Sequence, residues 1–440
     1  MTVAHETGTT EASARPRAGL AFWTAAAVIV VALWASASPA MVYPLYEQAW
    51  ALSPAVITAV FAVYPVVLIV ALLLIGDLSD HIGRRSAMLL GLASLTVGVL
   101  VFALAPGVEW LFVGRVFQGL GVGLSLSPAG AALVEFDRRG GRASSANTVA
   151  IAIGLTLATV VGGALVEYAP LPRALTFWVL LVVILVVAVA AMWLPRHTRS
   201  TSERWRPRPI HVPRRLRGIL ATAALAVTLS FAIGSVFISL GAQIVESVLH
   251  TDDAMIGGTV LAIGAAVSGV VSISLRRMPA RTSTIIGAAL GVLSVVALVA
   301  SAAASSLPLF IAASLLFGGS SGLLFLGALG LIAANAPAQH RAGTLSMVYL
   351  FAYAGQVLTS VGLGVLATGI GMRAGLDVVG PLLLLLAAAT IVVAVLAGRS
   401  PAAESELTAA AGTSTVPVRT SGVPVRTSGV PVVCRPSAID

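Results

Sequence analysis

Long apolar runs alternate with short polar segments along most of the chain. An apolar helix needs roughly 20 residues to cross the hydrocarbon core of a bilayer, and twelve runs are long enough. They lie at residues 20–43, 55–76, 86–105, 109–136, 144–167, 173–194, 217–240, 254–275, 282–303, 307–334, 343–368 and 377–397. The pattern predicts an all-α integral membrane fold with twelve transmembrane helices. Composition agrees, because only 10% of the 440 residues are charged, whereas soluble domains carry about 25%.

Arginine sets the orientation of these helices. All 26 basic residues are arginine; with the N-terminus inside, the inner segments hold 23 of them, the outer loops hold two, and Arg115 lies within a span. Basic residues collect on the cytoplasmic side, so both termini are predicted to be cytoplasmic, in a multi-pass protein of the inner cell membrane. The positive charge then faces anionic lipid of the bilayer, and no nucleic-acid partner is expected.

A basic, proline-rich segment divides the twelve spans into six and six. The predicted domains are an N-terminal tail (1–19), a first six-helix half (20–194), a cytoplasmic linker (195–216), a second six-helix half (217–397) and a disordered tail (398–440) that contains VPVRTSG twice. The halves repeat faintly at a shift of 199 residues, which pairs Gly119 and Gly123 with Gly318 and Gly322. Such repeats are typical of transporters whose binding site lies between the halves.

The polar segment between the second and third spans has a distinctive pattern, Gly76-Asp77-Leu78-Ser79-Asp80-His81-Ile82-Gly83-Arg84-Arg85. Its five ionisable side chains would be costly in lipid, and its glycines permit a tight reversal. The pattern resembles the signature loop between helices 2 and 3 of the major facilitator superfamily.

The resemblance implies gating roles for residues around this loop. In that family the acid and the arginine of the loop hold the two halves together in one conformation, and an acid at the end of helix 4 joins them. On this chain these residues are Asp80, Arg84 and Glu135. Asp80 is also expected to face the start of helix 11, near Gly343 and Thr344. The full set of implied gating residues is Gly76, Asp80, Gly83, Arg84, Arg85, Glu135 and Arg142.

Arg115 is the one arginine within a predicted span. A guanidinium there is costly unless it meets water, a partner or a substrate, and Gln118 follows on the same helical face. The R-x-x-Q-G-x-G pattern resembles the fourth-helix motif of the superfamily, whose arginine is linked to proton coupling or substrate charge. The alternative is an arginine that snorkels to the outer interface.

The fifth span contains Gly154, Gly162 and Gly163. This spacing resembles the antiporter motif of the superfamily, although Ala158 and Thr159 replace its central Gly-Pro. The alternative is that these small residues only permit close helix packing.

Several polar and aromatic residues within the spans are candidates for a central, weakly polar site. Tyr349, Tyr353 and Gln356 share one helical face at i, i+4 and i+7. The other candidates are Ser36, Ser38, Tyr43, Tyr64, Asn147, Ser230, Ser235 and Gln243, together with Trp34 and Phe61.

The sequence predicts a secondary transporter that resembles the multidrug-efflux branch and exports a hydrophobic small molecule by proton antiport. No carboxylate lies in the middle of a span, which leaves proton-linked or facilitated uptake of a metabolite, or a non-transporting sensor, as alternatives. No phosphate loop, metal-ligand spacing or catalytic cluster is found, so neither an enzyme nor a bound cofactor is expected, beyond a proton gradient. A monomer with a small-molecule substrate is expected.

Overall fold

The computed structural model describes residues 8–75, 78–137, 142–195, 216–247, 254–336 and 338–396. Within these ranges the side chains of 8–18, Ile75, Ser79, Asp80, Ser247 and 338–342 are not described. The predicted linker and C-terminal tail, together with Gly76, therefore lie outside the described residues, apart from the linker ends at Pro195 and Leu216. The predicted domain boundaries stay predictions.

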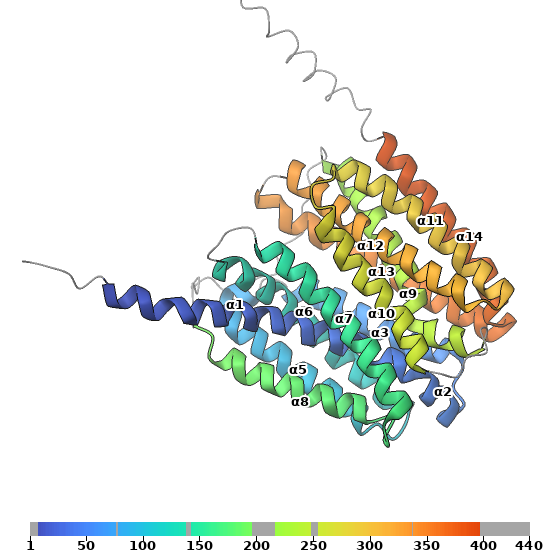
Figure 1. Cartoon of the computed structure of the whole chain (residues 1–440), viewed down its shortest axis with the longest axis horizontal. Helices are drawn as coiled ribbons and strands as arrows, with labels where there is room; N and C mark the ends of the chain where they lie inside the picture. Colours follow the sequence, from blue (N-terminus) through green and yellow to red (C-terminus); the bar gives the residue numbers. More distant parts are fainter. Residues whose placement is uncertain are drawn as a thin grey trace, which may run out of the picture. The chain divides into compact units, whose positions relative to one another are not determined.

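The described chain is all helical, and all twelve predicted spans are present (Figure 1). The first half contains α1 (Gly8–Ala37), η1 (Ser38–Met41), α2 (Tyr43–Trp50), α3 (Pro54–Ile75), α4 (Leu78–Ile82), α5 (Arg84–Ala103), α6 (Val108–Phe136), α7 (Arg142–Tyr168) and α8 (Leu175–Met192). The second half contains α9 (Arg217–Ser247), α10 (Ala254–Ser274), α11 (Ala280–Ala304), α12 (Leu307–Asn335), α13 (Ala338–Ile370) and α14 (Met372–Leu396). Helix ends are called inner and outer below according to the predicted topology.

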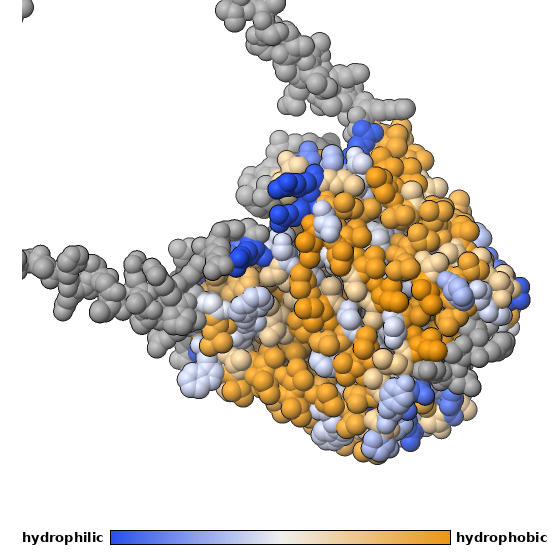
Figure 2. Space-filling model, in the orientation of Figure 1, coloured by the Kyte–Doolittle hydropathy of each residue, from blue (hydrophilic) through white to orange (hydrophobic). Residues whose placement is uncertain are grey.

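Each half has its own buried apolar core. Outward-facing side chains are also apolar, as for Val182 on α8 and Leu385 on α14, which are 60% and 67% exposed. Figure 2 shows this face of the molecule as mainly hydrophobic, with hydrophilic residues gathered toward two opposite ends. A surface of this kind is suited to contact with lipid.

The internal repeat is visible in the helix packing. A Cβ on Gly119 would lie 2.8 Å from the Tyr64 carbonyl oxygen of α3, and one on Gly318 would lie 2.4 Å from the Gly264 carbonyl oxygen of α10. In each half, therefore, the fourth span packs closely on the second through a glycine at the same repeat position. Small residues at such crossings let helix backbones approach.

A second feature is shared by the two halves: an arginine at the start of the third span hydrogen-bonds carbonyl groups at the end of the sixth span. The Arg85 guanidinium donates a hydrogen bond to the Leu194 carbonyl at the end of α8 (3.2 Å). The Arg281 guanidinium donates to the Ala394 and Val395 carbonyls at the end of α14 (2.9 and 2.5 Å). Cations at helix C-termini satisfy free carbonyls and oppose the helix dipole. The role of Arg281 was not predicted from the sequence.

The outer end of the first span differs from the prediction. The predicted first span ends at residue 43, but the residues that follow form helix α2 as far as Trp50. The predicted seventh span ends at residue 240, but α9 continues to Ser247 and includes Glu246. Both helices continue beyond the apolar run, because hydropathy marks the buried length of a helix and not its last turn.

Candidate functional site

Pro39 ends α1 within the first membrane span. Proline has no N–H, so the Ala35 carbonyl lacks its helical donor and accepts instead from the Ser38 hydroxyl (3.1 Å). The chain continues as the short 3₁₀ helix η1 into α2. The break leaves main-chain carbonyls available to a side chain from another helix.

Arg115 of α6 occupies this break and is fully buried. Its Nη1 donates to the Ser36 carbonyl (2.7 Å) and to Gln118 Oε1 (3.0 Å). Its Nε donates to the Tyr43 hydroxyl (2.9 Å), and Nη2 also hydrogen-bonds this hydroxyl. Four of the five guanidinium N–H groups are therefore used. The snorkelling alternative is wrong, since no part of this side chain reaches an exposed surface.

The Arg115 charge is surrounded by aromatic rings. Its Cζ lies 5.5–5.9 Å from the ring centroids of Tyr43, Phe61, Tyr64 and Phe102. This is within cation–π range. The salt bridge found among the described residues joins other side chains, so oxygens and ring faces stabilise the Arg115 cation.

A layer of aromatic side chains connects this site to the second half. Tyr353 of α13 packs against the buried core of the first half, which includes Tyr64. Tyr353 packs edge-on against Phe231 of α9 with centroids 4.9 Å apart, and Tyr349 stacks on Tyr353 at 6.3 Å. The predicted α13 face therefore contacts both halves.

Besides Gln118 Nε2 next to Arg115, a buried polar atom in α1 and one in α13 have no hydrogen-bond partner among the described residues. They are Nε1 of Trp34 in α1 and Oε1 of Gln356 in α13, in side chains that are 6% and 8% exposed. An unpaired buried polar group is costly, so each is a candidate contact for a polar atom of a substrate. Asn147 lies apart from this layer, because it approaches Gly130 of α6, about 22 Å along that helix from Arg115.

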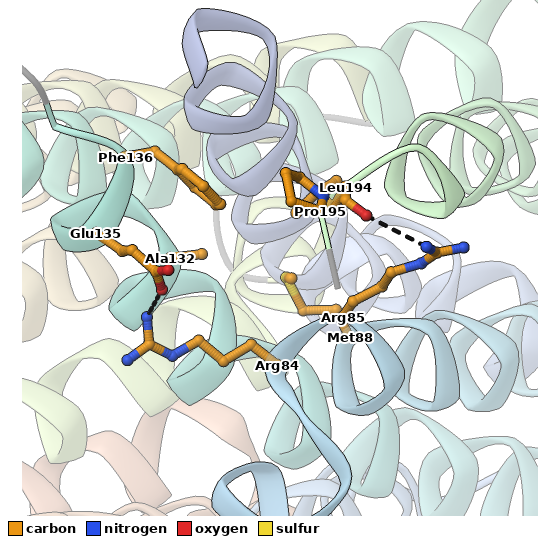
Figure 3. A pocket seen from close by; sticks show the side chains of 8 residues that line it. All are labelled: Arg84, Arg85, Met88, Ala132, Glu135, Phe136, Leu194 and Pro195. Atoms are coloured by element: carbon orange, nitrogen blue, oxygen red, sulfur yellow. Dashed lines mark hydrogen bonds and ion pairs between the residues drawn. The ribbon is translucent and has the colours of Figure 1, made fainter. Parts of the chain in front are cut away.

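Arg84 and Arg85 of the signature loop lie at the inner end of α5, where they line a small pocket with Glu135 of α6 (Figure 3). Arg84 forms an ion pair with Glu135 and donates to the Ala131 carbonyl (3.3 Å). Gly83 precedes α5 with φ +84°, a conformation that favours glycine. The Asp80 side chain lies outside the described residues, so its proposed contacts with Arg84, Glu135 and the start of the eleventh span (α13) stay predictions.

The start of α7 is capped by a residue that was not predicted. Asp137 Oδ2 accepts hydrogen bonds from the backbone N–H groups of Arg142 (2.6 Å) and Ala143 (3.0 Å). The negative charge at this N-terminus also opposes the helix dipole. The Arg142 side chain is exposed.

The Arg84–Glu135 ion pair is half exposed, with 39% and 32% of the side chains accessible. We expect Glu135→Gln to change the free energy of unfolding by no more than about 1 kcal/mol, because exposed ion pairs contribute little. Thermal unfolding in detergent measures this. A larger loss would show that the pair is a stability element and would weaken its assignment to gating.

The glycines of the fifth span, which is α7, lie at three helix-packing contacts. A Cβ on Gly154 would lie 2.5 Å from the Val30 carbonyl oxygen of α1, and one on Gly162 would lie 3.1 Å from Met41. A Cβ on Gly163 would lie 2.8 Å from the Ala254 carbonyl oxygen of α10. The motif therefore holds α7 against its own half and, through Gly163, against the other half.

Four hydrogen bonds between described residues join the outer ends of the two halves. They are Gln48–Glu246 (2.6 Å), Gln243–Glu47, Ala55 N–Thr368 Oγ1 (3.0 Å) and Ala254 N–Glu167 Oε2 (3.0 Å). The halves are thus in contact across the outer side in this conformation.

Comparison with known proteins agrees with this architecture. The family model described as Major Facilitator Superfamily matches residues 23–306. The chain belongs to this superfamily.

Curated relatives match over short stretches only. The chain is 38% identical over 100 residues to an uncharacterized MFS-type transporter, EfpA, of Mycobacterium tuberculosis. The matched stretch covers 22% of this chain and 19% of EfpA. It is 36% identical over 113 residues to the multidrug efflux pump LfrA of Mycolicibacterium smegmatis (24% and 22%). It is 40% identical over 91 residues to the human proton myo-inositol cotransporter (20% and 14%).

Solved transporter structures share the fold over most of the chain. A bacterial homologue of the human lysosomal transporter Spinster superposes with a TM-score of 0.67 at 13% identity, and covers 88% of this chain and 97% of its own. The nucleoside transporter NupG superposes with a TM-score of 0.67 at 11% identity (85% and 99%). The chain therefore has this fold, with twelve described helices that are long and apolar enough to cross a membrane.

Proposed function

We propose that this protein is a secondary transporter of the inner cell membrane that exports a hydrophobic small molecule in exchange for protons. The observation that carries the proposal is the aromatic layer where the buried core of the first half, which includes Tyr64, meets Tyr353, Tyr349 and Phe231 of the second. Stacked rings with few polar groups suit an apolar, aromatic substrate. The partial likeness to the multidrug efflux pump LfrA supports the efflux direction.

The unpaired polar atoms narrow the proposed substrate class. The indole N–H of Trp34 donates and the amide oxygen of Gln356 accepts. A neutral compound with one hydrogen-bond acceptor and one donor on an aromatic frame would satisfy both. The nearby Arg115 cation is already enclosed by protein groups, so a net negative charge on the substrate is not required.

Alternating access would supply the mechanism. Rocking of the two halves would expose the aromatic layer to each side in turn, with different substrate affinity in the two states. A transporter needs no resident cofactor and performs no covalent chemistry, so we propose no cofactor and no enzymatic activity. We also propose that the protein works as a monomer and that a proton gradient is its energy source.

The second candidate is proton-linked uptake of a metabolite, which the likeness to the human proton myo-inositol cotransporter favours. Efflux and uptake are distinguished in inverted vesicles that have an acidic interior, where a pH-sensitive dye reports the loss of protons. Export by antiport predicts proton loss when a lipophilic aromatic compound is added outside. Uptake by symport predicts no such loss until the compound is loaded inside. No response in either arm, with folded protein present, would favour a non-transporting sensor.

The vesicle assay also tests the aromatic layer. We expect Tyr353→Phe to raise the concentration of compound that gives half-maximal proton loss by several-fold, because it removes the polar hydroxyl where α13 packs against the first half and keeps the ring. Tyr168→Phe is the matched control, since Tyr168 is 74% exposed and lies outside the layer. Equal responses of both variants and the parent would contradict a substrate site in this layer.

A further inference from the structure

Among the described helices, two pairs make long contacts between the halves: α7 with α10, and α3 with α13. At the first crossing, a Cβ on Gly163 would lie 2.8 Å from the Ala254 carbonyl oxygen near the outer end. Nearer the inner end, a Cβ on Gly269 would lie 2.7 Å from the Cβ of Ala152. Small residues therefore hold α7 against α10 at both depths.

The crossing of α3 with α13 differs between its two ends. At the outer end, Gly364 of α13 lies directly against the Thr58 side chain, and the Ala55 N–H donates to Thr368 Oγ1 (3.0 Å). At the inner end, larger side chains leave a small pocket between the halves. The pocket is lined by Ile69, Leu72, Leu73, Ser346 and Leu350. We call these five residues the inner crevice.

The sequence of α3 explains why this inner end stays hollow. Helix α3 contains no glycine, so leucine and isoleucine side chains keep the two backbones apart where the other crossing has glycine. Pro65 lies in α3 between Tyr64 of the aromatic layer and Ile69 of the crevice. It has no N–H for the Phe61 carbonyl and permits the helix to bend there. The inner part of α3 is therefore free to take a different direction from the outer part, which stays packed on α13.

The inner crevice lies between the lipid-facing surface and the aromatic layer. On its lipid side Leu73 is 41% exposed, and the next residue, Leu74, is 53% exposed. On its other side Leu350 follows Tyr349 directly and lies one helical turn from Tyr353. The predicted topology places this end of α3 and α13 at the depth of the inner leaflet. The crevice is thus continuous with the layer that carries the proposed substrate site.

The lining of the inner crevice suits a lipophilic compound. Four of its five side chains are aliphatic, the fifth is a hydroxyl, and none carries a charge. Such a lining does not offset the cost of removing a charged or strongly polar group from water. A neutral compound that is already dissolved in the leaflet enters without that cost and is held by apolar contacts.

We propose that the inner crevice is an entry site, at which a neutral, lipophilic aromatic compound passes from the inner leaflet to the aromatic layer. The proposal rests on the proposed export function for its role, and it adds the route by which the substrate arrives. Hydrogen bonds hold the outer side closed in the same conformation, so a compound that enters from the inner leaflet is retained. The glycine contacts between α7 and α10 close the other crossing to lipid.

Photolabelling tests this site without transport. The full chain, in nanodiscs of phosphatidylethanolamine and phosphatidylglycerol, is exposed to increasing amounts of a trifluoromethyl phenyl diazirine, a neutral aromatic photolabel that dissolves in lipid. Mass spectrometry then identifies the labelled residues. We expect labelling of Leu72 and Leu350 to saturate as the photolabel concentration rises. Labelling of Val182, a lipid-facing residue of α8 that is 60% exposed, is expected to rise in proportion to that concentration.

A variant that fills the inner crevice provides the matched test. We expect Ser346→Trp to weaken the saturable labelling about tenfold, because the indole occupies the space and removes apolar surface that the photolabel would bury. Leu358→Trp places the same side chain at a lipid-facing position of α13, where Leu358 is 74% exposed, and is expected to label as the parent does. If Ser346→Trp does not fold, Leu350→Trp replaces it, with labelling measured at Leu72.

Two labelling results would overturn the proposal. One is labelling of Leu72 and Leu350 in proportion to the photolabel, as expected if only phospholipid acyl chains fill the inner crevice. The other is saturable labelling that Ser346→Trp leaves unchanged. In the vesicle assay the same variant should slow substrate-induced proton loss, and a parent rate would show that the crevice is not on the route. Saturable labelling without any transport would count against the proposed export function and would still support the binding site.

Discussion

Arg115→Lys is expected to lower the transport rate by roughly ten- to hundredfold while the protein still folds. Lysine retains the positive charge, but its compact ammonium cannot reach Ser36, Gln118 and Tyr43 together as the planar guanidinium does. A hydrogen bond to a charged group contributes about 1.5–3 kcal/mol. Loss of one such hydrogen bond in the transport transition state would lower the transport rate by roughly ten- to hundredfold. Substrate-induced proton loss in inverted vesicles measures this rate.

The alanine variant adds a second effect. Arg115→Ala leaves the Ser36 carbonyl and the Gln118 amide oxygen buried without their donor, at a cost of about 1–3 kcal/mol each. We therefore expect lower thermal stability for alanine than for lysine. Arg173→Lys, in the outer loop, is the control that should behave as the parent. A lysine variant at Arg115 with the parent rate would show that this residue only carries charge.

Gly258→Val is expected to hold the outer side open. A Cβ at Gly258 of α10 would lie 2.4 Å from the Thr159 carbonyl oxygen and 3.3 Å from Gly163 Cα, both on α7. These are backbone atoms, so the two helices must move apart where the halves meet. Overpacking of this kind costs roughly 1–3 kcal/mol, or a five- to 150-fold change in the closed-to-open ratio.

The neighbouring glycine provides the control for this variant. At Gly257 a Cβ would lie 3.9 Å from its nearest contact, Val245, so Gly257→Val changes the same helix without forcing α10 from α7. Spin labels attached at Leu171→Cys and Ala304→Cys, exposed outer positions of opposite halves in a Cys434→Ser background, report the closed and open populations of both variants through the distance between the labels. Closed populations that fall equally in the two variants would show that valine disturbs α10 itself, and would contradict the assignment of this crossing to gating.

Sequence patterns were sufficient for the helices, for one shared helix face and for one ion pair. The apolar runs predicted all twelve spans because hydrocarbon thickness fixes their length. The spacing of Tyr349, Tyr353 and Gln356 predicted a shared face on α13, and the signature loop predicted the approach of Arg84 to Glu135. In each case the signal is local or is supplied by a family pattern.

Contacts between distant segments were not predicted. Gln243 and Glu47 are 196 residues apart, and no periodicity links them. Arg281 lacks the surrounding motif of Arg85, although both cap the sixth span of their half. Pro39 lies inside an apolar run, and the consequence of its missing N–H depends on Arg115, which reaches the break from another helix. The depth of Arg115 likewise required the tertiary structure.

Transport by the purified chain is the most direct test of the central claim. The chain is reconstituted into liposomes with an acidic interior, and a labelled aromatic compound selected in the vesicle assay is added outside. The account predicts accumulation above the external concentration, its collapse with a protonophore, and its slowing by roughly ten- to hundredfold in Arg115→Lys. Simple equilibration that ignores the proton gradient, or uptake that is equal in the Arg115→Lys variant, would contradict it.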